Sequence, residues 1–221
     1  MKEYFGILKQ SPLFAGVSRE ALPHVLRCME ARTAIYGKGE IICHYGDRTP
    51  YGGIVLEGKA ALVVPGEDGE ESCIRMTGPA QAFGCSRSCS CGQPSTVTII
   101  ARTRTTVLFL KLSKLFCPEA LGCQYAGLVM SNVLKETAAE NLAQEQRIHI
   151  MSQKSIRGKL KMLLSQSALC GNKAVLSMNR QELADYLGVE RSALSREMRR
   201  MKDDGLIDYC RNEITIFYKT A

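Results

Sequence analysis

Hydrophobic residues follow two successive patterns in the first half of this 221-residue chain, and each predicts a different structure. Residues 1–30 are helical in pattern, because Leu22, Val25 and Leu26 recur at the spacing of one helix face. Residues 31–111 change to short β-prone runs that are separated by glycine-rich turns. The clearest of these runs are residues 41–44, 54–57, 60–64, 96–101 and 106–110. Many short strands at such spacing predict a small all-β barrel or roll.

A long helix is predicted over residues 118–153, which contain no proline after Pro118 and glycine only near the start. Its apolar residues recur at mostly helical spacing, and they are Leu128, Met130, Leu134, Ala138, Leu142, Ile148 and Met151. A helix of about 35 residues is longer than is usual in a compact domain. We expect it to pack against its own copy in a homodimer. The alternative is a broken helix that lies on the β-roll.

The last third of the chain predicts a winged helix. Helical patterns cover residues 155–167, 180–187 and 190–204. Two β-prone runs follow at residues 206–209 and 214–218, with residues 211–213 as the turn between them.

Residues 180–201 have the features of a helix-turn-helix. Asn179 can cap the first helix, with Glu182 at the reciprocal position of a capping box. Ala184 is small where the second helix crosses the first, and Gly188 follows at a position that commonly requires a positive φ. The buried face of the second helix is predicted to comprise Val189, Leu194, Met198 and Met201.

The outer surface of that second helix carries basic and hydroxyl side chains. Its residues are Arg191, Ser192, Ser195, Arg196, Arg199 and Arg200. Arginine can pair bidentately with guanine, and hydroxyl groups suit base edges or phosphates. Residues 151–221 carry 13 Lys and Arg against 8 Asp and Glu, whereas residues 1–150 carry 16 against 14. The excess charge thus lies where a DNA-binding module needs it, although an amphipathic helix pair with a solvated basic face is the alternative.

Composition narrows the class of protein. Hydrophobic residues make up 45% and charged residues 23%, as in ordinary globular proteins. Neither a membrane-length apolar run nor a secretory signal occurs, so we expect a cytoplasmic protein without a membrane partner. Motifs typical of nucleophile elbows, phosphate loops and zinc proteases are missing, so we do not expect an enzyme. A metal or redox protein whose winged helix binds other proteins is a third class.

The order of these segments resembles the Crp–Fnr superfamily of bacterial transcription regulators. A glycine-punctuated β-roll, a long helix, the sequence Ser-Gln-Lys-Ser-Ile-Arg-Gly-Lys-Leu at residues 152–160 and a winged helix carry the resemblance over nearly the whole chain. It implies an α+β fold with three domains. These are a cyclic-nucleotide-binding-like β-roll (a double-stranded jelly roll) at residues 1–117, a dimerisation helix at 118–153 and a winged helix-turn-helix at 154–221.

The resemblance also implies partners and reading residues. A homodimer would bind a near-palindromic operator with half-sites about 34–36 Å apart, and an activator would also contact RNA polymerase. The base-reading positions correspond to Arg191, Ser192, Ser195 and Arg196. The Ser195–Arg196 pair matches the fumarate-nitrate group, and Arg191 matches the cyclic-AMP receptor group. Ser192 departs from both groups, which have glutamate there, so neither consensus operator can be assumed.

The effector segment departs further from the family. Its cassette begins Phe-Gly-Glu and ends Arg-Ser/Thr-Ala, and the two charged residues hold the ribose and the cyclic phosphate. Here the cassette begins Phe83-Gly84-Cys85, and Pro94 precedes Ser95 and Thr96 in its last part. Because a buried phosphate without its arginine is costly, we do not expect cyclic AMP to bind. Candidate pocket residues are Phe83, Gly84, Cys85, Ser95 and Thr96.

Ten cysteines leave further cofactors open. Cys85, Cys89 and Cys91 could hold zinc or an iron–sulfur cluster with a fourth ligand, or form a thiol switch beside Arg87. The candidate fourth ligands are Cys43, His44 and Cys73. The C-x3-C-x-C spacing matches no strong metal signature, and the cysteine cluster of the family's iron–sulfur regulators lies near the N-terminus, where the first 27 residues here contain none. A small anion, an aromatic ligand, haem or no ligand are the other possibilities.

Overall fold

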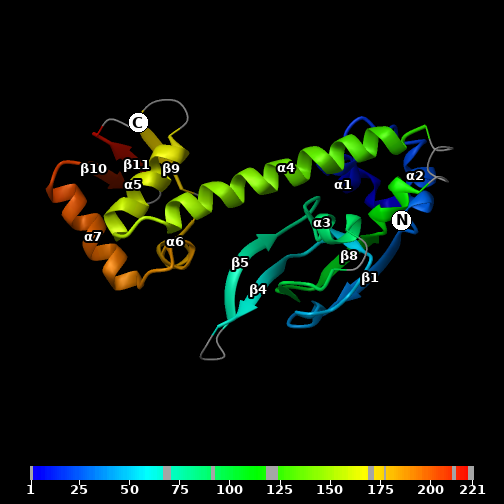
Figure 1. Cartoon of the computed structure of the whole chain (residues 1–221), viewed down its shortest axis with the longest axis horizontal. Coiled ribbons are helices and arrows are strands. Elements are labelled where there is room, and N and C mark those ends of the chain that lie inside the picture. The colour runs from blue at the N-terminus through cyan, green and yellow to red at the C-terminus, as the bar shows by residue number, and fades with distance from the viewer. Residues whose placement is uncertain are drawn as a thin grey trace. The chain divides into compact units, whose positions relative to one another are not determined.

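The computed structural model describes residues 2–66, 71–90, 93–117, 124–168, 172–176, 178–210 and 213–218. The chain divides into two compact units, residues 1–139 and residues 140–221, and Figure 1 labels many of their elements. The first unit holds two β-sheets and short helices, and the second holds a helix-turn-helix and a small sheet. The α+β fold class, with a β-sheet domain, a long helix and a helix-turn-helix domain in that order, is the one predicted from the sequence.

Short helical segments begin the first unit. They are η1 (Lys2–Tyr4), α1 (Phe5–Gln10), η2 (Pro12–Phe14) and α2 (Leu22–Cys28). Leu22, Val25 and Leu26 are buried, which confirms the predicted apolar face. They belong to one apolar cluster with Leu108 and Leu110 of the neighbouring sheet, so the helices cover that sheet.

Two antiparallel four-stranded sheets form the β-roll. The first has the order β1 (Arg32–Tyr36), β8 (Thr105–Leu110), β3 (Gly52–Glu57) and β6 (Ala82–Phe83). The second has the order β2 (Ile41–Cys43), β7 (Thr98–Ala101), β4 (Ala60–Pro65) and β5 (Glu71–Thr77). Val55 and Val107 of the first sheet cluster with Ala60 and Ile99 of the second, whereas Ile54 faces the helices. The central strands of the first sheet, β8 and β3, are therefore buried on both faces.

The five β-prone runs predicted from the sequence all contain strands, namely β2, β3, β4, β7 and β8. β1 and β5 were not among them. Both are edge strands, and of the seven residues of β5 only Thr77 is buried. A strand that is exposed on both faces has no apolar alternation from which to predict it.

The long helix is α4 (Ala126–Met151), which starts later than predicted. Residues 118–123 lie outside the described part of the chain. Val129 and Val133 are buried in the first unit, and buried Asn132 donates hydrogen bonds to the carbonyl oxygens of Leu13 (3.1 Å) and Ala15 (2.8 Å). Several of the apolar residues that predicted the helix are exposed within the chain, and these are Leu128, Leu134, Leu142, Ile148 and Met151.

The second unit has the element order of a winged helix. Its elements are α5 (Ile156–Ser167), β9 (Lys173–Val175), α6 (Arg180–Leu187), α7 (Arg191–Asp203), β10 (Ile207–Cys210) and β11 (Glu213–Ile216). The sheet order is β10-β11-β9, so the predicted hairpin gains a third strand. β9 has one buried residue, Ala174, and its sequence carries no strand pattern. Residues 211 and 212 of the predicted turn lie outside the described residues.

Candidate nucleic-acid interface and sensor segment

The start of α6 is fixed by the capping box that the sequence predicts. The Asn179 side-chain oxygen accepts hydrogen bonds from the backbone N–H groups of Gln181 (2.9 Å) and Glu182 (3.0 Å). The Glu182 carboxylate in turn accepts from the Asn179 N–H at 2.7 Å. These bonds satisfy N–H groups that have no partner within the helix, which stabilises a helix start by about 1 kcal/mol.

The turn between α6 and α7 needs its glycine. Gly188 has φ +59° and ψ +51°, in the left-handed region. The Val189 N–H donates to the carbonyl of Ala184 at 3.0 Å, which closes the helix end. Ala184 is fully buried, as predicted for the crossing of the two helices. The helix-turn-helix geometry therefore follows from the sequence features that predicted it.

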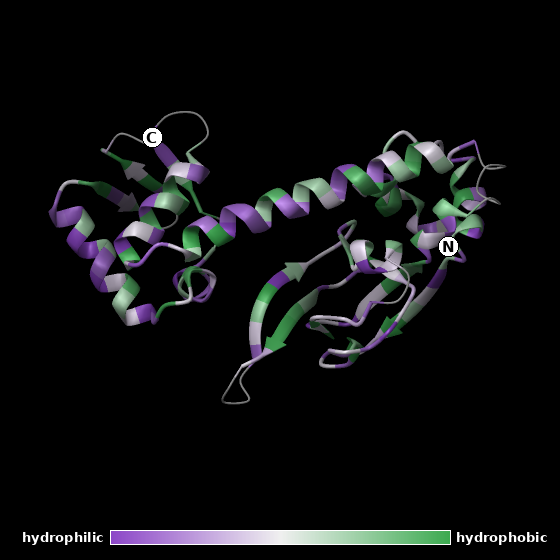
Figure 2. Ribbon diagram, viewed as in Figure 1, coloured by the Kyte–Doolittle hydropathy of each residue, from purple (hydrophilic) through white to green (hydrophobic). Residues whose placement is uncertain are grey.

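One face of α7 is buried and the other is exposed. Leu194, Met198 and Met201 are buried in the core of the second unit, as predicted for the inner face, whereas Val189 precedes α7 and is only partly buried. Hydrophilic and hydrophobic residues alternate along this helix in Figure 2. The six residues predicted for the outer, DNA-binding surface are all exposed, and they are Arg191, Ser192, Ser195, Arg196, Arg199 and Arg200. α7 thus presents four guanidinium groups and two hydroxyl groups, one of which, that of Ser192, donates to the Glu190 carboxylate.

An arginine that the sequence did not single out joins α5 to α7. Arg157 Nε lies 2.6 Å from Glu197 Oε1, and its Nη1 lies 2.7 Å from Asp204 Oδ2. Hydrogen bonds to Glu197 and then Asp204 raise the pKa of Arg157 above its ordinary value. The partners are about forty residues apart in sequence, so no local pattern could have indicated the pairing.

The candidate effector segment begins with buried residues. Phe83 is buried between the sheets, and a side chain on Gly53 of the paired strand would overlap its ring. Gly84 is left-handed, with φ +66°, and precedes the short helix α3 (Cys85–Cys89). Cys85 is buried in the apolar cluster with the N-terminal helices. A thiol in an apolar cluster replaces the glutamate that the family places here.

The end of this segment also lacks charge. Ser95 is buried, and its hydroxyl donates to the carbonyl of Val97 at 2.7 Å. Pro94 is exposed and pairs with Arg48 in an isolated β-bridge, and Thr96 is exposed. Of the five candidate pocket residues, Phe83, Cys85 and Ser95 are buried.

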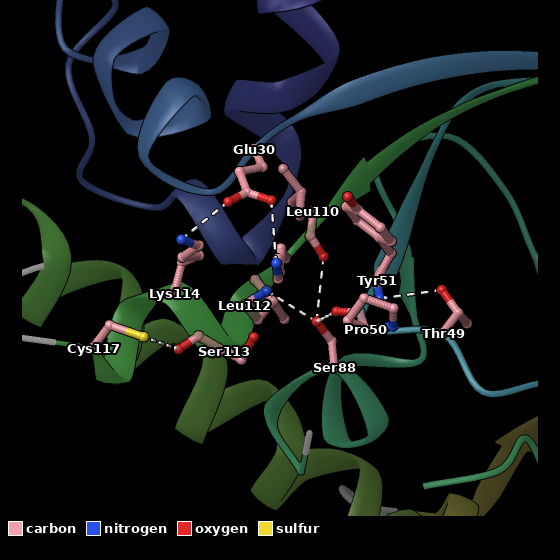
Figure 3. A network of polar contacts seen from close by, with 11 residues as sticks. Glu30, Thr49, Pro50, Tyr51, Ser88, Leu110, Leu112, Ser113, Lys114 and Cys117 are labelled. Carbon is pink, nitrogen blue, oxygen red and sulfur yellow. Dashed lines mark hydrogen bonds and ion pairs between the residues drawn. The ribbon is translucent and has the colours of Figure 1, made fainter. Parts of the chain in front are cut away.

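A serine holds α3 in place. The Ser88 hydroxyl donates to the carbonyls of Pro50 (2.7 Å) and Leu110 (3.3 Å) and accepts from the Leu112 N–H at 2.9 Å. Figure 3 shows how these bonds connect α3 to the end of β8 and to η3 (Leu112–Phe116). Glu30 pairs with Lys111 (3.3 Å) and Lys114 (3.0 Å), and the pair with Lys114 is labelled in Figure 3. Both sets of contacts fix η3, which follows β8.

The proposed cysteine cluster is only partly described. Cys85 and Cys89 lie one turn apart on α3, and Cys91 lies outside the described residues. Within the described ranges, no group of three or more His, Cys, Asp or Glu side chains could hold a metal ion. Cys43 lies in the cluster between the sheets, and Cys73 is exposed on β5. The metal and thiol-switch interpretations stay predictions.

Comparison with known families matches both units. Residues 34–116 match the cyclic nucleotide-binding domain, and residues 160–219 match the Crp-like helix-turn-helix domain. The cyclic AMP receptor protein of Thermus thermophilus is 22% identical over 200 residues, which are 90% of this chain and 89% of that protein. Among the helices described here, none has the length and hydrophobicity of a membrane span.

Solved structures share the fold. The catabolite activator protein of Thermus thermophilus aligns with a TM-score of 0.56 and 21% identity over 94% of each chain. CprK in complex with OCPA aligns with a TM-score of 0.65 and 15% identity, over 90% of this chain and 92% of that one. FixK2 of Bradyrhizobium japonicum aligns with a TM-score of 0.55 and 20% identity, over 85% of this chain and 93% of that one.

Proposed function

The chain belongs to the Crp–Fnr superfamily of transcription regulators, and on that premise we propose that it binds a specific DNA operator as a homodimer. It reads the operator with α7. Its β-roll responds to an effector or redox signal, and that signal is not cyclic AMP. The proposed domains are residues 1–117 for the sensor, 118–153 for the dimerisation helix and 154–221 for DNA binding.

The exposed face of α7 is the observation that carries this proposal. Its buried face anchors the helix, so the exposed arginines can enter a DNA groove without disturbing the core. Arg191, Ser195 and Arg196 lie in its first half, where the recognition helix of this motif contacts base edges. Arg199 and Arg200 follow in the second half, where they suit phosphates.

The operator should differ from those of the two best-known groups of the family. Ser192 occupies the position where they have glutamate, and its shorter, neutral hydroxyl is a weaker acceptor for a cytosine amino group than a carboxylate. Half-sites should be about 34–36 Å apart if the two copies of α7 enter successive major grooves.

The exposed face of α4 supports a homodimer. Leu134 is 70% exposed and Leu142 is 59% exposed on the same helix. These two positions are about 80° apart around the helix, so both lie on one side of it and can be buried against a partner helix.

The effector is proposed to differ from cyclic AMP because the chain lacks both charged groups of the cassette. Buried Cys85 and exposed Pro94 stand at those two positions. Neither residue can pair with a cyclic phosphate, and an unpaired phosphate would be costly to bury. One relative is named a cyclic AMP receptor and another structure holds OCPA, so the shared fold does not fix the effector.

Replacing Arg196 tests the reading helix. DNA enriched from a randomised library by the full-length protein should shift in a gel with the wild type, and Arg196→Ala should weaken that binding by about tenfold or more, since a bidentate pair contributes about 1–3 kcal/mol. Arg104→Ala removes an equal charge from an exposed site of the first unit and should bind like the wild type. Equal binding by Arg196→Ala and the wild type would contradict the assignment of α7.

A further inference from the structure

Glu197 lies on α7 between two guanidinium groups. Its side chain is only 15% exposed, although it lies on the helix that carries the reading arginines. One carboxylate oxygen is 2.6 Å from Arg157 Nε on α5, and the other is 3.9 Å from Arg200 Nη1 on its own helix. The shorter distance shows which arginine holds Glu197. Arg200 remains 72% exposed.

Asp204 places a second negative charge at the end of α7. A carboxylate near the C-terminus of a helix is unfavourable, because that end already carries a partial negative charge. Arg157 Nη1 lies 2.7 Å from Asp204 Oδ2, so the same guanidinium compensates both carboxylates. The planar fork of arginine suits two acceptors at once, whereas lysine offers a single point charge.

Without Arg157, Glu197 would keep a largely buried charge and lose its nearest cation. A buried carboxylate without a partner is costly, and a pair three residues apart on a helix can form with little rearrangement. Arg200 is the cation available at that spacing. Its guanidinium would then turn toward Glu197 and away from the surface that faces DNA.

We propose that Arg157 is a positioning residue for DNA binding. By holding Glu197 and Asp204, it keeps α7 electropositive and leaves Arg200 available to a DNA phosphate. This inference rests on the proposed function and assigns to α5 a role in the charge of the reading surface.

Variants of the full-length protein in which glutamine replaces a charged residue test the proposal. The readout is fluorescence anisotropy with a labelled mixed-sequence DNA duplex over a series of salt concentrations. Arg157→Gln should lower affinity about tenfold, and the slope of log affinity against log salt should fall by about one per protomer, the signature of a lost phosphate contact. Lys154→Gln removes the same charge from an exposed residue just before α5, and it should leave the affinity within about twofold of the wild type and the salt slope unchanged.

Rescue separates this role from a merely structural one. Glu197→Gln in the Arg157→Gln chain removes the carboxylate that competes for Arg200, so affinity and salt slope should return to near wild-type values. Glu197→Gln alone should bind at least as tightly as the wild type. A double variant as weak as Arg157→Gln, or a Glu197→Gln variant that binds fivefold more weakly, overturns the proposal. Thermal unfolding followed by circular dichroism checks that each variant is folded. If the wild type shows no salt-dependent DNA binding, the proposed function fails instead.

Discussion

Phe83 and Gly53 pack against each other, and the requirement for glycine at residue 53 follows from this contact. They lie opposite each other on β6 and β3, and the Phe83 ring occupies the space that a side chain on Gly53 would fill. Glycine is required here by this close approach rather than by its backbone angles. Phe83 packs in the β-roll core, and its place in an effector pocket stays a prediction.

A methyl group at residue 53 should therefore be costly. Gly53→Ala should lower the free energy of unfolding by about 3 kcal/mol, because the buried ring has no space into which to move. Urea unfolding followed by circular dichroism measures the change. Phe83→Leu in the same chain should recover part of the loss. Gly127→Ala, where a side chain would meet open space on α4, should cause no loss; a comparable loss there would show that the Phe83 contact is not the cause.

Elements with strong end signals could be predicted from the sequence, and elements held by distant contacts could not. The predicted bounds of α6 agree with the structure because Asn179 and Gly188 mark its two ends chemically. α3 has five residues, too few for a helical period, and its place depends on the Ser88 contacts with residues distant in sequence. The role of Arg157 could not be predicted for the same reason, because its partner Glu197 lies on α7. The exposed face of α7 was predictable because burial of its apolar residues fixes the opposite side.

Removing the Ser88 hydroxyl should loosen the attachment of α3 to η3. Ser88→Ala leaves the buried Leu112 N–H without its acceptor, which should cost about 1–3 kcal/mol of unfolding free energy. Ser90→Ala is a matched control on the same segment, because the exposed Ser90 hydroxyl bonds within its own turn at 2.8 Å. Its change should stay within about 0.5 kcal/mol. Equal losses for the two variants would show that Ser88 does not anchor α3.

Charge and apolar surface are distributed unevenly over the whole molecule. The basic excess lies in residues 151–221, and exposed leucines lie on α4. Exposed apolar side chains on a helix favour association, whereas a basic surface repels its own copy unless DNA neutralises it. α4 is therefore the element on which a dimer would depend, and α7 the one that DNA would contact.

A charge on the exposed face of α4 should separate the dimer. Leu142→Glu should shift the mass measured by light scattering from that of a dimer toward that of a monomer, because two carboxylates would meet in an apolar contact. Gln144→Glu adds the same charge to an exposed residue about 200° around the helix and should remain dimeric. A wild type that is monomeric at micromolar concentration, or a dimeric Leu142→Glu variant, would contradict the proposed interface.

The burial of β3 on both faces also limits how this sensor can evolve. Five successive residues of β3 are buried, so nearly every substitution in the strand disturbs either the second sheet or the helices. Selection for a new signal can act with least damage on the exposed residues of the segment that connects the two sheets, such as Ser86, Pro94 and Thr96. Lineages that share this β-roll can then diverge in what they detect while its interior stays nearly constant. The loss of both charged cassette residues in a chain that keeps the fold is what such a division predicts.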